Sequence, residues 1–570
     1  MKSLLIDIGS TFIKYCTYNI LNKQIEKEEK IPFPVPCLDD GGRYEVKSED
    51  IKKLVLDIFD KRADCEKAFI SVQMHGYVMK TENGFENYVS WRDKSGDVTD
   101  RRLDGVDFDA MGTAKKQNLP LVKLAFKDID GEFFTLGSFI AYTLTGKNET
   151  HITDAAASGF FLRDTCKPNG YQGKMKMPTV AKSVKPIGKY KGITVYTPIG
   201  DHQISVLGSE INRNKYLVNI GTATQISCVD TKEHPNGQYE KRPYFDSEIL
   251  YTVSGLVGGH TLYKGEGIDG LYAQLIDAIK KLPKKSEILF GGGGAKPAFE
   301  KLKGRLEKIG IKSSITNENI GQRGLIKMAN QNKLNVGTML SEITFPNFPI
   351  IAKQSGLDFI IIDNEHGCFD YSHISALIMN ANLIGLDAIV RVGSSDRGHI
   401  TKLADMGVHG FLLPMTNTAD DIKQVVNYAK YTPIGKRGVS TTRAHTLYNP
   451  PELKEYMTQA NEKMKVYAQI ETLAGVENID SILALEGVDG VLVGPNDLSV
   501  DLNCIGDNKT LLTYIERVAV AANKIGKPWG IITANKELLA FATENNAKFV
   551  SVGSELNMLL NGCKKIAEQF

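Results

Sequence analysis

The stretch DFIIIDNEHGCFDY, Asp358 to Tyr371, decides the fold of the second half of the chain. Its four central apolar residues are typical of a strand that is buried on both faces, as in a parallel sheet. The strand runs directly into Asp363, Asn364, Glu365 and His366. Burial disfavours charged side chains unless they are paired with an opposite charge. Charged residues at the end of a buried strand therefore suggest an ion pair or a functional role.

The apolar run at Asp358 is one of a regular series. From residue 335 onward, eight short apolar runs begin at residues 335, 359, 388, 410, 466, 490, 529 and 549. Most of the gaps between them carry helix-like patterns, such as SHISALIMNANLIG and ADDIKQVVNYAK. A strand followed by a helix, repeated eight times, predicts a (β/α)₈ TIM barrel.

Polar residues collect where this barrel should carry its function, at the C-terminal ends of the strands. Glu471 and Asp497 follow neighbouring strands, so their carboxylates can share a divalent cation such as Mg²⁺ or Mn²⁺. Arg391 lies in the third strand and can stabilise an oxyanion. A histidine held by a carboxylate, as His366 could be, can move protons. Any one such acid could be a helix cap or a surface ion pair, but so many at one rim favour catalysis.

These motifs resemble a known family over the whole of residues 335–570. DFIIIDNEHGCFD, VRV, PIGKRGVSTTRA, AQIET and GPNDLS are similar, in this order, to the motifs of the HpcH/HpaI family of class II pyruvate-dependent aldolases. The resemblance implies that Glu471 and Asp497 bind Mg²⁺, Mn²⁺ or Co²⁺, that Arg391 steadies the enolate, and that His366, with Asp363 behind it, is the acid–base residue. It also implies a homo-oligomer assembled through the barrel, and further substrate-binding positions at Gln469, Gly435 and Gly438.

The first half of the chain contains three glycine-rich motifs. LLIDIGSTFIKYCTYN predicts a β-hairpin whose tip, Gly9 to Thr11, offers backbone N–H groups and hydroxyls to phosphate. YLVNIGTATQISCV repeats this pattern at Gly221 and Thr222. EILFGGGGAKPAFEKL predicts a strand, a glycine loop and a helix, and it is not a P-loop because no Gly-Lys-Ser/Thr follows. Each motif alone is weak, since an ordinary β-turn would look the same.

Together the three motifs resemble the FGGY carbohydrate kinases of the actin–hexokinase superfamily, over about residues 1–330. SVQMHGYVM and VSWRDKSGD look like the sugar-binding segments of xylulokinase- and sedoheptulokinase-like members, and TPIGDHQISVLG looks like the segment with the catalytic base, here Asp201. The resemblance implies that sugar contacts come from Gln73, Met74, His75, Trp91 and Asp93. It implies that ATP with Mg²⁺ lies at Asp7, Gly9, Ser10, Thr11, Lys14, Gly221, Thr222, Gly292, Gly293 and Ala295.

The predicted architecture is therefore α/β throughout, a two-lobed actin/hexokinase-like kinase fold followed by the barrel. We expect an N-terminal kinase lobe at residues 1–200, a shortened second lobe at 201–332 and the barrel at 333–570. The polar segment Met328 to Gly337 is the expected junction.

Composition limits the partners and the compartment. A net charge of +2 gives no general attraction to nucleic acid or to membranes. The eight cysteines are scattered without metal-like spacing, and no apolar run has the length of a membrane span. We expect a cytoplasmic protein with reduced thiols.

Two functions remain open from the sequence. The first is a bifunctional enzyme, an ATP-dependent carbohydrate kinase fused to a metal-dependent aldolase, acting on a sugar or sugar acid and on a 2-oxo acid. The second is a single-activity aldolase whose N-terminal half is a non-catalytic module that binds a sugar or a nucleotide.

Overall fold

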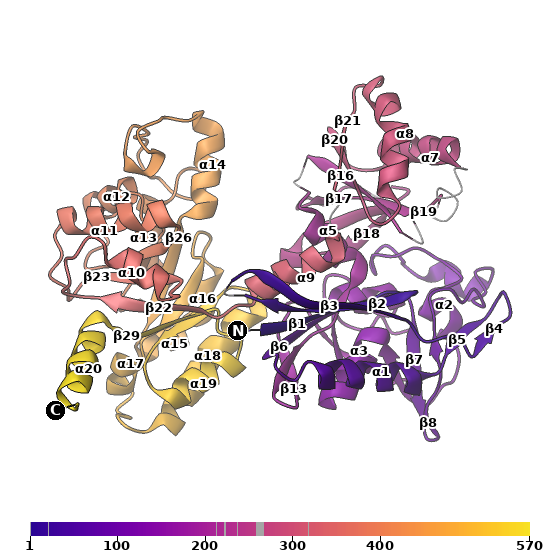
Figure 1. The fold of residues 1–570 in the computed structure, drawn as a ribbon, viewed down its shortest axis with the longest axis horizontal. Coiled ribbons are helices and arrows are strands. Elements are labelled where there is room, and N and C mark those ends of the chain that lie inside the picture. The colour runs from indigo at the N-terminus through magenta and orange to yellow at the C-terminus, as the bar shows by residue number, and fades with distance from the viewer. Residues whose placement is uncertain are drawn as a thin grey trace. The chain divides into compact units, whose positions relative to one another are not determined.

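The computed structural model describes residues 2–20, 22–211, 214–221, 224–235, 237–257, 267–316 and 319–569. The chain forms two compact units, Met1–Asn332 and Lys333–Phe570 (Figure 1). Helices with both the length and the apolar character of a membrane span are absent from these described ranges.

The N-terminal lobe of the first unit is built on a mixed sheet with the strand order β13-β14-β6-β1-β2-β3. The predicted hairpin is confirmed, since β1 and β2 pair antiparallel with Asp7 opposite Lys14. β1 also pairs in parallel with β6. The bounds are β1 Lys2–Ile8, β2 Phe12–Asn19, β3 Gln24–Pro32, β6 Lys67–Val72, β13 Pro186–Tyr190, β14 Ile193–Tyr196, β15 Ile199–Gly200, α1 Ser48–Lys61 and α3 Leu136–Thr145.

A smaller sheet of short strands, β10-β7-β9-β5-β4, completes this lobe and carries the segments expected to bind a sugar. Its core is aromatic and aliphatic, with Phe133, Phe160 and Phe161 fully buried. The bounds are β4 Leu38–Asp39, β5 Tyr44–Val46, β7 Tyr77–Thr81, β8 Gly84–Phe85, β9 Tyr88–Val89, β10 Glu132–Thr135, β11 Glu149–His151, β12 Thr179–Ala181, α2 Pro120–Leu124 and α4 Ile152–Ala155.

The second lobe, like the first, is built on a mixed sheet that contains an antiparallel hairpin. This sheet has six strands in the order β18-β19-β17-β16-β20-β21. β16 and β17 form the second antiparallel hairpin, and β20 pairs in parallel with β16. The bounds are β16 Lys215–Ile220, β17 Thr224–Asp230, β18 Glu240–Pro243, β19 Ile249–Leu256, β20 Glu287–Gly291, β21 Lys312–Ile315, α5 Asp201–Ser209, α7 Ile268–Lys281, α8 Ala295–Glu307 and α9 Ile320–Gln331.

Two glycines let α5 and α9 cross in close contact. A Cβ atom on Gly208 would lie 1.8 Å from the Ile320 carbonyl oxygen, and one on Gly324 would lie 2.0 Å from that of Ile204. Only residues without a side chain fit at such a crossing. The crossing fixes the position of α5, whose first residue is Asp201.

The second unit is a closed barrel of eight parallel strands, as predicted (Figure 1). Its interior is filled by Phe359, Ile361, Ile389, Leu412, Leu492 and Phe549, so it is a packed core and not a pore. The strands are β22 Asn335–Leu340, β23 Phe359–Asn364, β24 Asp387–Val392, β25 Gly410–Leu413, β26 Lys465–Ile470, β27 Gly490–Val493, β28 Trp529–Ile532 and β29 Phe549–Ser554. The helices are α10 Phe348–Gln354, α11 Tyr371–Ile384, α12 Arg397–Asp405, α13 Ala419–Ala429, α14 Leu453–Lys463, α15 Leu473–Glu477, α16 Ile479–Ala484, α17 Pro495–Asp501, α18 Asn508–Ile525, α19 Lys536–Glu544 and α20 Glu555–Ala567.

The boundary between the two units, after Asn332, lies inside the expected junction Met328 to Gly337, although most of that segment is helix or strand. α9 continues to Gln331, and β22 already begins at Asn335. The helix continues because Met328 and Ala329 are buried on its apolar face. Only residues 332–334 lie between the two elements.

Candidate active sites

The rim of the barrel carries an ion pair between neighbouring strands. Asp363 on β23 lies opposite Arg391 on β24. The Arg391 Nε and Nη2 atoms donate to the two oxygens of the Asp363 carboxylate, at 2.9 and 2.6 Å. Such a two-point contact fixes the plane of the guanidinium group.

The charges around this pair keep both partners ionised. Burial acts to raise the pKa of Asp363, but the hydrogen bond and charge of Arg391 hold it below its ordinary value. Burial acts to lower the pKa of Arg391, but Asp363, Glu365 and Glu471 together raise it. Arg391 is therefore a fixed, permanent cation at the strand ends.

The expected support of the His366 ring by Asp363 differs from the structure. Asp363 instead accepts hydrogen bonds from Arg391 and from the backbone N–H groups of Glu365 and His366. The His366 Nε2 atom lies 3.8 Å from the Glu365 carboxylate, and its side chain is 75% exposed. Glu365 also contacts the Arg391 Nη1 atom at 3.3 Å. The carboxylate beside His366 is thus Glu365, because the tight turn after β23 commits Asp363 to the backbone and to Arg391.

Glu471 follows β26 and is buried at the same rim. Its Oε1 atom accepts a hydrogen bond from the Met415 backbone N–H at 2.6 Å, and its Oε2 atom one from the Gln469 Nε2 atom at 2.5 Å. Burial, together with the negative charge of Asp497, raises the pKa of Glu471. A cation between the two carboxylates would relieve this repulsion.

Gly494 keeps the position next to the Glu471 carboxylate free of a side chain. Gly494 precedes α17, the helix of Asp497, and a Cβ atom there would lie 2.6 Å from the Glu471 Oε2 atom. The Gln469 Oε1 atom is buried without a hydrogen-bond partner. Within the described ranges, no group of three or more His, Cys, Asp or Glu side chains is arranged to hold a metal.

Gly494→Ala is expected to weaken metal binding by about 10–100-fold, as changes beside metal ligands typically do. The methyl group would meet Glu471 and the Gln469 amide within 3.0 Å. Isothermal titration with Mn²⁺ measures the affinity. Gly398→Ala is the matched control, because nothing lies within 4 Å of its Cβ position. Equal affinities for Mn²⁺ in the two variants would contradict this position for the metal.

The loop glycines expected near the substrate differ in their surroundings. A Cβ atom on Gly435 would lie 2.2 Å from the Lys430 carbonyl oxygen, so this glycine permits a close approach of two backbone segments. The nearest atom to a Cβ on Gly438 is the Arg397 Nη2 atom at 3.6 Å. Gly435 is therefore required by the packing of the backbone, whereas the backbone around Gly438 has space for a side chain.

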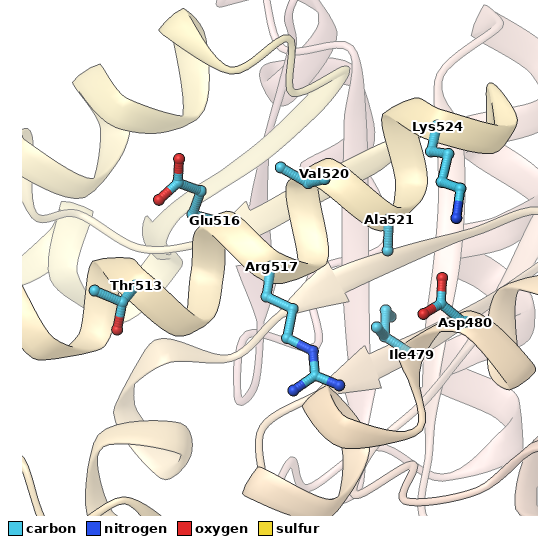
Figure 2. Close-up of a pocket in the computed structure, with 8 residues that line it drawn as sticks. All are labelled: Ile479, Asp480, Thr513, Glu516, Arg517, Val520, Ala521 and Lys524. Atoms are coloured by element: carbon cyan, nitrogen blue, oxygen red, sulfur yellow. The ribbon is translucent and has the colours of Figure 1, made fainter.

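A pocket on the outer side of the barrel does not belong to this rim. Figure 2 shows that its lining residues come from α16 and α18, among them Asp480, Glu516 and Arg517. None of the strand-end residues lines it.

The first unit places two carboxylates together between its lobes. Asp7, at the end of β1, accepts a hydrogen bond from the Ser71 hydroxyl at 2.7 Å. The positive charge of Lys14 acts to lower the pKa of Asp7. Asp201 is the first residue of α5, and its N-cap is Gly200, so it is not itself the cap. Burial and the charge of Asp7 raise the pKa of Asp201 to about 7. A carboxyl group with this pKa is suited to accept a proton near neutral pH.

The tip of the first hairpin has a cationic neighbour. The Arg92 Nη2 atom lies 3.4 Å from the Ser10 hydroxyl and 3.3 Å from that of Thr11. Gly9 closes the turn by donating its N–H to the Phe12 carbonyl oxygen. A cation beside hydroxyls and backbone N–H groups is suitable for phosphate.

The second and third glycine motifs are partly described. Gly221 follows β16, whereas the predicted position Thr222 lies outside the described residues. Gly292 has a φ of +91°, and a Cβ atom there would lie 2.6 Å from the Ile220 carbonyl oxygen. Gly293 follows it, and Ala295 begins α8. The glycines therefore let the loop after β20 lie directly on β16.

The residues expected to bind a sugar divide into two groups. Met74 and His75 line a small pocket in the first unit, and the Gln73 amide atoms are buried without partners. Burial lowers the pKa of His75 to about 3, so its ring is neutral. Asp93, in contrast, forms an ion pair with Lys123 at 2.8 Å and accepts a hydrogen bond from the Ser95 backbone N–H in its own loop. The Trp91 ring lies next to the Arg92 guanidinium group.

Sequence reasoning missed Arg242, which lines this pocket, and the ion pairs that link it through Glu240 to Lys116. Glu240 and Arg242 come from β18, and Lys116 comes from the N-terminal lobe. Three consecutive charged residues in a short strand, Glu240 to Arg242, were the available signal. The sequence could not reveal that Glu240, Arg242 and Lys116 are brought together.

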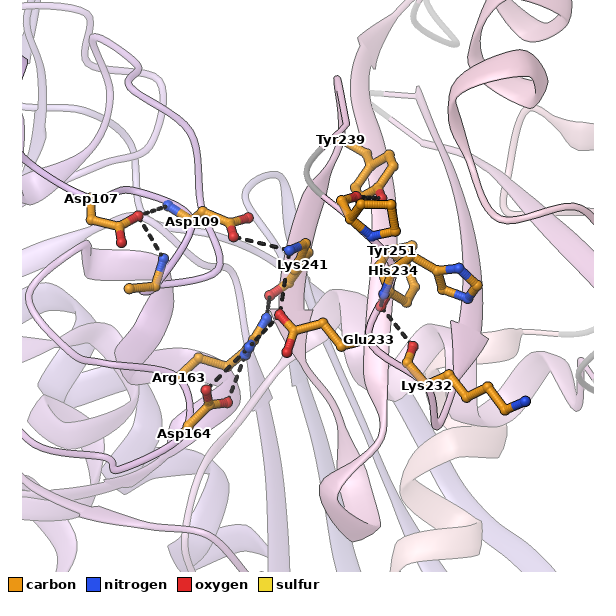
Figure 3. A network of polar contacts seen from close by, with 12 residues as sticks. Asp107, Asp109, Arg163, Asp164, Lys232, Glu233, His234, Tyr239, Lys241 and Tyr251 are labelled. Carbon is orange, nitrogen blue, oxygen red and sulfur yellow. Dashed lines mark hydrogen bonds and ion pairs between the residues drawn. The ribbon is translucent and has the colours of Figure 1, made fainter.

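The strand that carries Arg242 is anchored on the N-terminal lobe. Figure 3 shows the neighbouring Lys241 between Asp109 and Glu233, with Arg163 beside them. The Lys241 Nζ atom lies 3.1 Å from Asp109, and Arg163 lies 3.3 Å from Glu233. These contacts fix where Arg242 presents its guanidinium group.

Comparisons with known proteins agree with the two units. A family model described as "HpcH/HpaI aldolase/citrate lyase" matches residues 346–562. A 5-keto-4-deoxy-D-glucarate aldolase of Klebsiella pneumoniae subsp. pneumoniae is 32% identical over 218 residues, which are 38% of this chain and 84% of that relative.

Two solved structures of kinases resemble the N-terminal region. Gluconate kinase from Lactobacillus acidophilus matches with a TM-score of 0.52 and 17% identity, covering 58% of this chain and 89% of that one. Ligand-bound xylulose kinase from the same organism matches with a TM-score of 0.51 and 17% identity, with the same shares covered. The N-terminal region therefore has the fold of FGGY carbohydrate kinases.

Proposed function

The chain belongs to the HpcH/HpaI aldolase/citrate lyase family through its C-terminal barrel, and from this premise we propose that it is a bifunctional enzyme. The barrel cleaves or forms a carbon–carbon bond next to the enolate of a 2-oxo acid. The N-terminal unit transfers a phosphoryl group from ATP to a hydroxyl of a sugar or sugar acid. The aldolase proposal is supported most by the cluster of Arg391, Glu365, Glu471 and Asp497 at one rim.

The barrel's own side chains have separable tasks. Arg391, oriented by Asp363 and Glu365, donates hydrogen bonds to the enolate oxygen as negative charge develops there. His366, exposed at the rim beside Glu365, moves the proton of the aldol hydroxyl. Glu471 and Asp497 would hold a divalent metal, which supplies Lewis-acid stabilisation of the enolate when bound. The named relative suggests a keto-deoxy sugar acid as the substrate class.

The kinase step uses Asp201 as its base. A substrate hydroxyl oxygen forms a bond to the γ-phosphorus of ATP while the bond from that phosphorus to the bridging β–γ oxygen breaks. The hydroxyl proton goes to Asp201, and ADP leaves. The hairpin tip with Arg92 would face the transferred group, and Asp7 would face the Mg²⁺ that accompanies ATP. The raised pKa of Asp201, set by burial and by Asp7, supports this assignment.

The test is to assay both reactions on the full chain. Retro-aldol release of pyruvate-type products and ATP-dependent phosphorylation should both be measurable with sugar-acid substrates. If the aldolase is active but no sugar, polyol or sugar acid causes ATP turnover, the N-terminal unit is a binding module and not a kinase.

Assembly through the barrel stays a prediction. The C-terminal helix α20 leaves apolar side chains partly exposed, namely Leu556, Met558, Leu559, Leu560 and Ile566. Covering them with a second copy would remove this apolar surface from water. Light scattering on the assayed preparation gives the mass, and a monomer would contradict this assembly.

A further inference from the structure

A buried carboxylate joins the helix after the last barrel strand to the loop after the first one. Glu555 is the first residue of α20 and is only 1% exposed. Its Oε1 atom accepts hydrogen bonds from three consecutive backbone N–H groups, those of Ser341 at 2.6 Å, Glu342 at 2.7 Å and Ile343 at 3.3 Å. These three residues follow β22, so the contact lies at the same end of the barrel as the proposed aldolase site.

The end of β29 brings Glu555 to this place. β29 pairs in parallel with β22, and Ser554 lies opposite Met339 after a shift in the register. The Thr338 hydroxyl donates a hydrogen bond to the Gly553 carbonyl oxygen at 3.3 Å. The residue that follows Ser554 is therefore held beside the residues that follow β22.

The hydrogen bonds of the Glu555 carboxylate all go to this loop. Among the described residues, the partners of its Oε1 atom are the three N–H groups, and its Oε2 atom is buried without a partner. A buried polar atom without a partner is uncommon and costly. Converging backbone N–H groups bind anions, and a charged acceptor makes stronger hydrogen bonds than a neutral one. A carboxylate therefore holds the loop more firmly than an amide would.

The loop that Glu555 holds is bonded in turn to the segment that carries His366. The Cys368 backbone N–H donates to the Ser341 carbonyl oxygen at 3.0 Å. The Cys368 thiol donates to the Glu342 carbonyl oxygen at 3.6 Å. Two hydrogen bonds thus connect loop 341–343 to the turn after β23.

Gly367 makes this packing close. A Cβ atom on Gly367 would lie 2.7 Å from the Ser341 carbonyl oxygen and 2.1 Å from the Asp363 carbonyl oxygen. Only a residue without a side chain fits between these two backbone segments. The residue that follows His366 is therefore in direct contact with loop 341–343, and a movement of the loop moves the turn.

The His366 ring depends on this backbone for its place. Its side chain is 75% exposed, and its Nε2 atom lies 3.8 Å from the Glu365 carboxylate, which is beyond hydrogen-bond distance. The Asp363 carboxylate holds the start of the turn through the backbone N–H groups of Glu365 and His366. Loop 341–343 holds the other end of the turn through Cys368.

We propose that Glu555 is a positioning residue for the acid–base step of the aldolase, because it holds the loop that sets the turn of His366. The inference rests on the proposed aldolase function. Glu555 acts through two contacts, from its carboxylate to loop 341–343 and from that loop to Cys368. A displacement of about 1 Å in a reacting group can cost about 10²-fold in rate, so a small movement of the turn is enough to slow the reaction.

Hydrogen–deuterium exchange tests the two contacts without a substrate. Glu555→Gln should speed exchange of the N–H groups of residues 341–343 by about 10–100-fold, the value of a hydrogen bond to a charged group. Exchange of the Cys368 N–H should rise with it. Glu568→Gln, at the exposed far end of α20, is the matched control and should change neither. Unchanged exchange at 341–343, or a change there that leaves Cys368 unaffected, overturns the inference.

Steady-state kinetics test the consequence for catalysis. Glu555→Gln should lower kcat for retro-aldol cleavage by about 10²-fold. KM and the affinity for Mn²⁺ should stay near those of the unaltered chain, because Arg391 and the proposed metal ligands lie on other elements. Glu555→Asp keeps the charge and should restore part of the rate. A loss that appears in KM or in Mn²⁺ affinity instead of kcat would assign Glu555 a general structural role and overturn the positioning role.

A double-mutant cycle identifies the residue through which Glu555 acts. Once His366→Asn has removed the imidazole, adding Glu555→Gln should lower kcat little further. Added to Arg391→Lys, it should lower kcat by its full factor, because the two act independently. Equal factors in the two backgrounds overturn the route through His366.

Failure of this inference and failure of the aldolase function give different results. If the unaltered chain cleaves no 2-oxo acid aldol, the proposed aldolase function is wrong, and hydrogen exchange alone decides whether Glu555 holds the turn of His366. If the chain is an aldolase and Glu555→Gln is as fast as Glu568→Gln, the aldolase function stands and the positioning role is wrong.

Discussion

Asp201→Asn is expected to lower ATP-dependent phosphorylation by about 10²–10⁴-fold, the usual effect of losing one general base. The substitution keeps the shape of the side chain and removes the group that accepts the hydroxyl proton. Nucleotide binding should persist, because Gly9, Thr11 and Gly292 are unchanged. The retro-aldol rate should also persist, since the barrel's chemistry uses other side chains. The measurement is ADP release with the best acceptor.

The pH profile gives a second readout of the same residue. Burial and Asp7 raise the pKa of Asp201 to about 7, and only the deprotonated form can accept a proton. The rate of the unaltered enzyme should therefore fall as pH drops below about 7 and level off above it. Asp201→Asn should lose this step. Asp269→Asn is a matched control, because Asp269 occupies the first turn of α7 and is almost fully exposed. An Asp201→Asn enzyme as fast as Asp269→Asn would show that another residue is the base.

Glu471→Gln is expected to reduce the aldolase rate by about 10³-fold, because a bound metal contributes several kcal/mol of transition-state stabilisation. The amide keeps the contact with Met415 but removes the negative charge of a proposed ligand. Excess EDTA should reduce the unaltered enzyme to a similar level, and added Mn²⁺ should restore it. The measurement is pyruvate release from a 2-oxo acid aldol.

The control for this variant is Glu486→Gln. Glu486 is exposed in the loop before β27, at the opposite end of the barrel from Glu471. Its aldolase rate and its response to EDTA should match those of the unaltered enzyme. Full activity of the unaltered enzyme in EDTA, or a substrate adduct trapped by borohydride, would exclude the metal-dependent mechanism.

The sequence by itself determined the elements and their order. Eight apolar runs became the eight strands of the barrel, because a parallel sheet that is covered on both faces requires continuous apolar segments. The glycine motifs became hairpins and a strand–helix turn where they were predicted, since glycine is needed where backbone segments approach closely, as at Gly292. That Glu471 and Asp497 follow adjacent strands also came from the pattern, because strand order in a barrel follows chain order.

Only the tertiary structure decided which charges meet. Asp363 pairs with Arg391, and Glu365 is left beside His366, because the register of β23 against β24 sets the first contact and the turn after β23 sets the second. Lys116 and Glu240 are far apart in the chain but lie 2.6 Å apart, since the packing of two lobes brings them together. Local pattern reports which face of an element is apolar. It does not show which charged residues on different elements form pairs, because the distance between two elements is set by packing.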